Sequence, residues 1–133
     1  MADRKQREVD AWIQKAENDM RGARIDMDAA PPLIEDALFH CQQAAEKAMK
    51  AFLTAHDTSF RKTHDLDELA MACEEIDTSP KEAEVLVPAR NLSIFAWEFR
   101  YPGDSVTPSK EEAYDAIVTA EKVVMAVRQR ITG

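Results

Sequence analysis

The stretch QQAAEKAMKAF, residues 42–52, lies in a segment with the periodicity of an amphipathic helix. At about 100° per residue, the apolar side chains of this segment gather on one face, which a row of alanines borders. The face consists of Ile34, Leu38, Cys41, Ala45, Ala48, Met49 and Phe52, and the border of Ala37, Ala44, Ala51 and Ala55. The pattern predicts a helix over residues 33–55, and its small alanine side chains let a neighbouring helix approach closely.

The opposite face of this expected helix carries a polar strip. His40, Gln43, Lys47 and Lys50 follow one another at spacings of three, four and three residues, so they line up along the helix. The simplest interpretation is a face in contact with water. The alignment of two lysines with a histidine and an amide also fits an anion-binding strip, and both interpretations stay open.

Four further helical segments follow from the same periodicity and from capping residues. They are expected at about residues 4–28, 66–76, 80–99 and 108–131. The first three begin just after Asp3, Asp65 and Ser79, which are residue types that cap helix N-termini. Pro88 lies inside the segment 80–99, and we expect it to kink that helix or divide it in two, because proline removes a backbone hydrogen bond.

The end of the segment 80–99 is apolar nearly all round, from Leu92 to Phe99. A helix that is apolar on every side is buried on every side, so this stretch lies either at the centre of the bundle or in a subunit interface. Together with the alanine border, it predicts a homodimer. No strand pattern occurs, and the sequence therefore predicts one all-α domain over residues 1–133, an antiparallel up-and-down bundle of four long helices plus one short helix.

Charge and composition limit the functions that the chain can have. The net charge of −8 argues against general nucleic-acid binding, although residues 65–84 alone hold eight acidic residues against one lysine, which leaves room for a basic groove elsewhere. The N-terminus has no signal-peptide core and no stretch is long enough to cross a membrane, so we expect a cytoplasmic protein. Cys41 and Cys73 fall on apolar faces without a second cysteine or histidine at ligand spacing, so we expect no metal and no cofactor.

Three sequence elements in a fixed order are similar to those of a known family. QQAAEKAMKAF at residues 42–52, THDL at 63–66 and FRYPGD at 99–104 resemble the HEPN (higher eukaryotes and prokaryotes nucleotide-binding) domains. The resemblance implies an all-α bundle that is usually a homodimer and is often paired with a small nucleotidyltransferase partner. It also implies one of two activities, metal-independent RNA cleavage or the binding of nucleotides and polyanions.

The sequence departs from the ribonuclease branch of that family. That branch carries an arginine followed after four to six residues by a histidine, whereas Arg100 is followed by none, and His40, His56 and His64 all lie upstream. Cleavage through the 2′-hydroxyl needs an acid and a base near neutral pH, which histidine usually supplies. The sequence thus favours a homodimeric nucleotide-binding, polyanion-binding or interaction module. The alternative is a ribonuclease-like toxin of a toxin–antitoxin pair, with an altered site built from Arg100, Tyr101 and His64.

No catalytic residue is assigned, and a ligand site is expected around the end of the segment 80–99. A guanidinium matches phosphate geometry, so Arg100 before the Pro102–Gly103 turn is the strongest candidate. The candidate ligand-binding residues are Arg100, Tyr101, Lys47, Lys50, His64, Gln43 and His40. Arg100 capping its own helix, and His64 making a local hydrogen bond, are the alternative interpretations.

Overall fold

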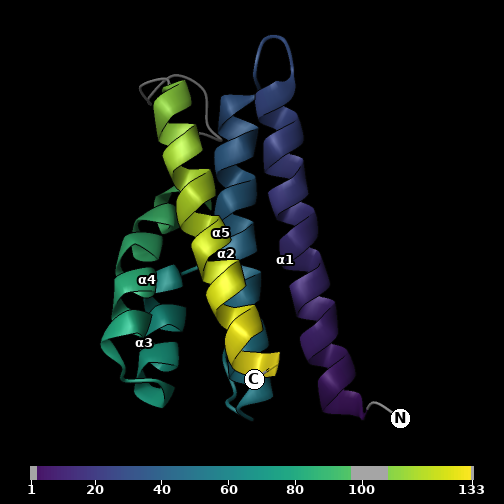
Figure 1. Ribbon diagram of the computed structural model, residues 1–133, viewed down its shortest axis with the longest axis vertical. Coiled ribbons are helices and arrows are strands. Elements are labelled where there is room, and N and C mark those ends of the chain that lie inside the picture. Colours follow the sequence, from purple (N-terminus) through teal and green to yellow (C-terminus); the bar gives the residue numbers. More distant parts are fainter. Residues whose placement is uncertain (1–2, 97–107, 133) are drawn as a thin grey trace.

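The computed structural model describes residues 3–96 and 108–132, and every regular element in these ranges is helical (Figure 1). The elements are α1 (Arg4–Asp28), α2 (Ile34–Ala55), α3 (Leu66–Ile76), α4 (Pro80–Arg90), the 3-10 helix η1 (Asn91–Ala96) and α5 (Lys110–Thr132). The all-α bundle expected from the sequence is confirmed, with α4 and η1 together forming the fourth long segment. Among the helices of these ranges, none has the length and apolar character that a bilayer crossing requires.

Helix α2 is the centre of the bundle. It packs against α1, α3, η1 and α5, and Figure 1 shows it between α1 and the α3–α4 pair, with α5 in front. More than half of its own residues are therefore buried: Ala37, Leu38, Cys41, Gln42, Ala44, Ala45, Glu46, Ala48, Met49, Lys50, Ala51, Phe52 and Leu53. The alanine border is part of this interior, because Ala37, Ala44 and Ala51 have no exposed surface. It admits neighbouring helices of the same chain, so it no longer supports a dimer interface.

Capping side chains fix where three of the helices begin. Asp3 accepts a hydrogen bond from the Gln6 amide at 2.8 Å, at the start of α1. Asp65 does the same for the amide of Asp67 at 2.9 Å, and Ser109 Oγ accepts from the amide of Glu112 at 3.1 Å. Each cap satisfies one of the backbone donors that a helix N-terminus leaves free.

The fourth segment changes its helical type shortly after Pro88. Helix α4 continues to Arg90 and is followed by η1, so within the described residues the segment expected over residues 80–99 is divided in two, one of the two outcomes expected for Pro88. The physical reason is the hydrogen bond that Pro88 cannot donate, which loosens the α-helical ladder. Leu92 is buried, but Ile94 is 43% exposed, so η1 is not covered on every side within one chain. Residues 97–99 lie outside the described ranges.

Both cysteines lie in the core, as the sequence predicted. Cys41 and Cys73 are buried and are not joined in a disulfide bond. Burial raises the pKa of the Cys41 thiol to about 12, so it stays neutral and behaves as a small apolar side chain.

Candidate functional site

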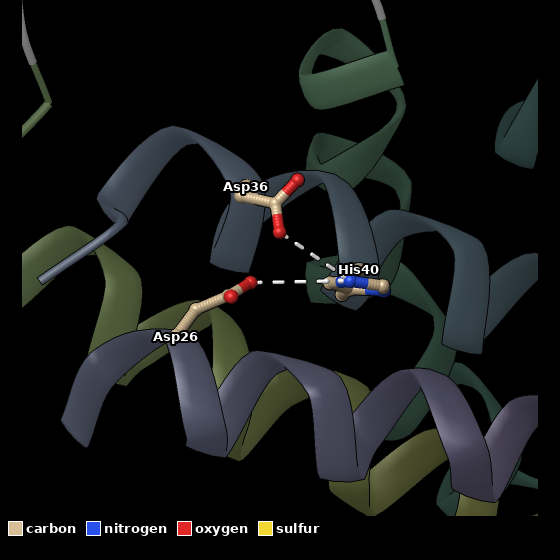
Figure 2. A group of neighbouring side chains, drawn as sticks. All are labelled: Asp26, Asp36 and His40. Atoms are coloured by element: carbon tan, nitrogen blue, oxygen red, sulfur yellow. Dashed lines mark ion pairs between the residues drawn. The ribbon is translucent and has the colours of Figure 1, made fainter. Parts of the chain in front are cut away.

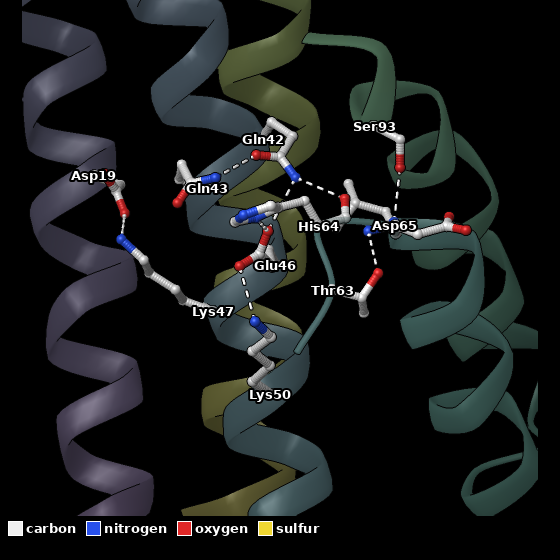
Figure 3. Close-up of polar contacts among 11 residues, drawn as sticks. Asp19, Gln42, Gln43, Glu46, Lys47, Lys50, Thr63, His64, Asp65 and Ser93 are labelled. Atoms are coloured by element: carbon white, nitrogen blue, oxygen red, sulfur yellow. Dashed lines mark hydrogen bonds and ion pairs between the residues drawn. The ribbon is translucent and has the colours of Figure 1, made fainter. Parts of the chain in front are cut away.

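The candidate residues of the sequence fall into two groups. Arg100 and Tyr101 lie outside the described residues. The other five lie along α2 and in the connection that follows it. Their polar partners are Asp19 on α1 and Gln42 and Glu46 on α2, which Figure 3 shows. The structure therefore tests the surroundings of the polar strip, but not those of the FRYPGD element.

Helix α1 covers one part of the polar strip with a carboxylate. Asp19 accepts from Lys47 Nζ at 2.6 Å through one oxygen (Figure 3). Its other oxygen lies 2.8 Å from His40 Nδ1. Because an ionised carboxylate can only accept, the proton of this contact belongs to His40 Nδ1. Asp19 is 8% exposed, so the charge of Lys47 is balanced by a nearly buried partner.

A second carboxylate on α2 organises the remaining strip residues. Glu46 is 3% exposed and lies 3.0 Å from Lys50 Nζ, 2.7 Å from His64 Nδ1 and 3.2 Å from Gln42 Nε2. Gln42 also donates to the backbone oxygen of His64 at 3.1 Å and accepts from Gln43 Nε2 at 2.7 Å. The network holds the loop before α3 against the middle of α2 (Figure 3).

These contacts change the interpretation of the polar strip. Lys50 is 7% exposed, so the expectation of a lysine in water is wrong for this residue. Each of the two lysines has a carboxylate within 3.0 Å, Asp19 for Lys47 and Glu46 for Lys50. A phosphate at the strip would compete with these buried carboxylates for the two lysines, so the strip by itself is a poor anion site.

Sequence reasoning missed Glu46 and Gln42, although both stand in the quoted stretch of residues 42–52. The available signal was their spacing. Gln42, Glu46 and Lys50 follow one another at intervals of four residues, and side chains so spaced meet on one helix face. The spacing alone could not show that this face is buried.

An open groove of about 940 Å³ lies between the first half of α1 and the residues that follow α2. We call it the aromatic groove; its lining includes Trp12, Phe60, Arg4, Lys5 and Lys15. Trp12 and Phe60 meet edge to face with 6.3 Å between ring centroids. Lys50 Nζ lies 5.4 Å and 5.8 Å from the two rings, within the range of a cation–π contact. Thus Lys50, a candidate from the sequence, contacts the two aromatic rings of this groove and helps to hold them in place.

A third group of polar side chains lies where α1 ends and α2 begins. Asp26, Asp36 and His40 bring two carboxylates and an imidazole together (Figure 2). Burial raises the pKa of Asp26 to about 6, the neighbouring Asp36 carboxyl adds to the rise, and His40 opposes it. With Asp19 on its other nitrogen, His40 faces three carboxylates, so its surroundings do not suit an anion.

Comparisons with known proteins agree on one family. A family model described as "HEPN domain" matches residues 9–130. The fold is similar to the crystal structure of ST0689, described as an archaeal HEPN homologue, with a TM-score of 0.73 and 27% sequence identity over 92% of this chain and 97% of that one. No curated protein matches this sequence.

Proposed function

Because this chain belongs to the HEPN family, we propose that it is a homodimeric module that binds nucleotides or polyanions, or a protein partner. A small nucleotidyltransferase is the partner we propose. The observation that supports nucleotide binding is the aromatic groove, where rings and cations lie side by side.

The groove has the two features that a nucleotide needs. Trp12 and Phe60 are partly buried side chains in its lining, and stacking on an aromatic ring is worth about 1–3 kcal/mol per base. The lining holds three cations, Arg4, Lys5 and Lys15, against the carboxylates of Glu8 and Asp57. Arg4 pairs with Glu8 and Lys5 with Asp57, whereas Lys15 forms no ion pair within residues 3–96 and 108–132. Lys15 is therefore the cation of the groove that we expect to meet a phosphate.

The test is a titration with ATP, GTP and a short single-stranded RNA at two salt concentrations. Tryptophan fluorescence serves as the signal for binding. We expect binding that weakens with salt and that Lys15→Ala weakens about threefold to tenfold. Arg100→Ala is expected to weaken it about tenfold to a hundredfold if the FRYPGD element contributes. Lys122→Ala, an exposed lysine on α5 away from the groove, is the matched control. Absence of binding below millimolar ligand, or equal binding by all variants, would contradict nucleotide binding.

The homodimer proposal is supported by apolar side chains that one chain leaves exposed. Tyr114, Val118 and Met125 on α5 are each more than half exposed, and their spacing puts them on one face. Ile94 in η1 is a second exposed apolar position. We expect Val118→Asp to dissociate the dimer, and Ile94→Asp to do so if η1 forms the interface instead. A parent protein that sediments as a folded monomer at tens of micromolar would contradict the dimer.

The proposed nucleotidyltransferase partner is supported by family membership alone. Co-expression with any small nucleotidyltransferase encoded beside this chain, followed by size-exclusion chromatography, tests it directly. A stable complex is the expected result, and separate elution of the two proteins at micromolar concentrations would count against it.

One observation favours the ribonuclease-like alternative. His64 is 66% exposed in its side chain, while its Nδ1 contacts the buried Glu46 at 2.7 Å. A carboxylate that orients one imidazole nitrogen leaves the other for proton transfer, which is the arrangement of a general base. Metal-free cleavage of a structured RNA that is lost in both His64→Ala and Arg100→Ala, with slowed cell growth on expression, would favour this toxin over the binding module.

A further inference from the structure

Three potential metal ligands meet at the hairpin between α1 and α2. Asp26 comes from the last turn of α1, Asp36 from the first turn of α2, and His40 from the next turn. His40 Nε2 lies 3.9 Å from Asp26 Oδ2 and 3.5 Å from Asp36 Oδ2 (Figure 2). One ligand atom from each residue lies within 4.8 Å of the other two.

In its neutral form, the imidazole of His40 carries its proton on the side away from these carboxylates. Nδ1 donates to Asp19 Oδ1 at 2.8 Å, and Asp19 is held in turn by Lys47 at 2.6 Å. In the neutral imidazole, Nε2 then carries a lone pair directed toward Asp26 and Asp36. A carboxylate that orients a histidine through its other nitrogen is the usual support of a metal-binding histidine.

Asp26 supplies independent evidence that a positive group is needed here. The residue is 8% exposed, and its Oδ2 is buried with no hydrogen-bond partner within the described residues. That oxygen points toward His40 in Figure 2. A buried acceptor without a donor is costly, and when His40 is neutral and both carboxyls are ionised, three acceptor atoms meet here.

Gly22 shows that α1 is shaped to receive the imidazole. A methyl group at Gly22 would lie 3.0 Å from Cε1 and Nε2 of His40. Glycine inside a helix is destabilising relative to alanine, yet Gly22 stands in the interior of the long helix α1. Its lack of a side chain leaves the space in which the ring of His40 lies.

We propose that Asp26, Asp36 and His40 form a binding site for a divalent first-row transition-metal ion such as Zn²⁺. An imidazole with two carboxylates suits this class of ion better than Mg²⁺ or Ca²⁺, which take oxygen ligands. Tetrahedral coordination at bond lengths of about 2.0–2.1 Å separates the ligand atoms by about 3.3 Å. The observed separations of 3.5 Å and 3.9 Å reach this with small movements, and Asp36, 55% exposed in its side chain, is free to make them.

The ion would join the last turn of α1 to the first turns of α2. Three protein ligands leave a fourth position for water or for a donor atom of another molecule. His40 is 29% exposed in its side chain, so the ion reaches the site from solvent.

Competition between the purified protein and a chromophoric chelator at neutral pH measures Zn²⁺ binding directly. We expect one Zn²⁺ per chain at micromolar or lower free metal, with no comparable binding of Mg²⁺ or Ca²⁺. Co²⁺ in place of Zn²⁺ should give the visible absorption of a tetrahedral ion. Absence of saturable, stoichiometric binding would overturn the proposal.

Variants decide whether the binding occurs at this cluster. Asp36→Asn and His40→Gln should each weaken Zn²⁺ binding at least about tenfold, and Gly22→Ala should weaken it by displacing the ring. Asp28→Asn, an exposed residue in the same turn as Asp26, and His56→Gln, whose ring packs on Phe52, should bind as the parent does. Circular dichroism checks that each variant folds. Because Asp36 is exposed, Asp36→Asn is the variant that we expect to disturb the fold least. Equal affinity in parent, Asp36→Asn and His40→Gln would overturn the proposal.

Discussion

Two histidine–carboxylate clusters on the same helix differ in their balance of donors and acceptors. Around Glu46, one carboxylate is shared by Lys50, His64 and Gln42, so its oxygens are well supplied with donors. Around His40 the ratio is reversed, because one imidazole meets the carboxylates of three aspartates, and only Asp19 also pairs with a lysine, Lys47. The first cluster is complete by itself, whereas Asp26 and Asp36 in the second share a single imidazole. The difference teaches that similar residue types can serve to hold a fold together or to receive a cation, depending on their surroundings.

The largest expected effect comes from breaking the complete cluster. Glu46→Ala leaves the buried ammonium of Lys50 without its partner, and loss of one member of a buried pair costs about 3–5 kcal/mol. Urea unfolding monitored by circular dichroism should therefore show a strongly lowered free energy of unfolding. The double variant Glu46→Leu with Lys50→Met removes both charges and should recover much of this loss. A cost below about 1 kcal/mol for Glu46→Ala would show that water reaches Lys50 and that the cluster is not closed.

A smaller effect of opposite sign is expected at the cluster around His40. With metal removed by a chelator, Asp26→Asn takes away a buried acceptor and adds an amide donor near His40 Nε2. Stability should rise by about 1 kcal/mol, the usual net value of one hydrogen bond. Thermal unfolding of parent and variant in chelator measures this gain in stability. The same measurement in Zn²⁺ tests the metal site, because the variant should lose the stabilisation by Zn²⁺ that we expect for the parent. Destabilisation in chelator would mean that this cluster is already balanced, as the one around Glu46 is.

The smallest effect is expected at the partly exposed ion pair of Asp77 with Arg130, which serves as the reference for both clusters. Hydrogen bonds from Arg130, 2.8 Å away, and then from Ser79 lower the pKa of Asp77 to about 2 from its ordinary 3.8. Because the pKa is lower in the folded state, the stabilisation is complete above about pH 4 and is lost as pH falls toward 2. Asp77→Asn should remove that part of the acid sensitivity. At neutral pH it should cost less than about 1 kcal/mol, because solvent screens the pair.

Unfolding titrations of parent and Asp77→Asn between neutral pH and pH 2 give the comparison. The two curves should approach each other as the pH falls toward the folded-state pKa of about 2. Curves that stay parallel throughout this range would show that the pairing with Arg130 does not persist in solution.

The sequence by itself determined the helices and the family. Side-chain periodicity set the bounds of α1 and α3 to the residue and that of α2 to within one, because helix formation and capping depend on neighbours in the chain. The three ordered elements of residues 42–52, 63–66 and 99–104 were sufficient to indicate the HEPN family, which the match over residues 9–130 confirms. The exception was the end of the fourth segment, where η1 replaces an α-helix.

Only the tertiary structure decided what each polar residue contacts. In the strip on α2, Lys47 pairs with Asp19, which stands 28 residues before it, and no local pattern joins the two. The expectation of no metal came from cysteine and histidine spacing, which does not register Asp26 and Asp36 on two different helices. Periodicity says which residues share a face, but the rotation and register of packed helices decide which faces meet. These depend on all contacts of the bundle at once, and that is why the buried charges of α2 could be seen only in the fold.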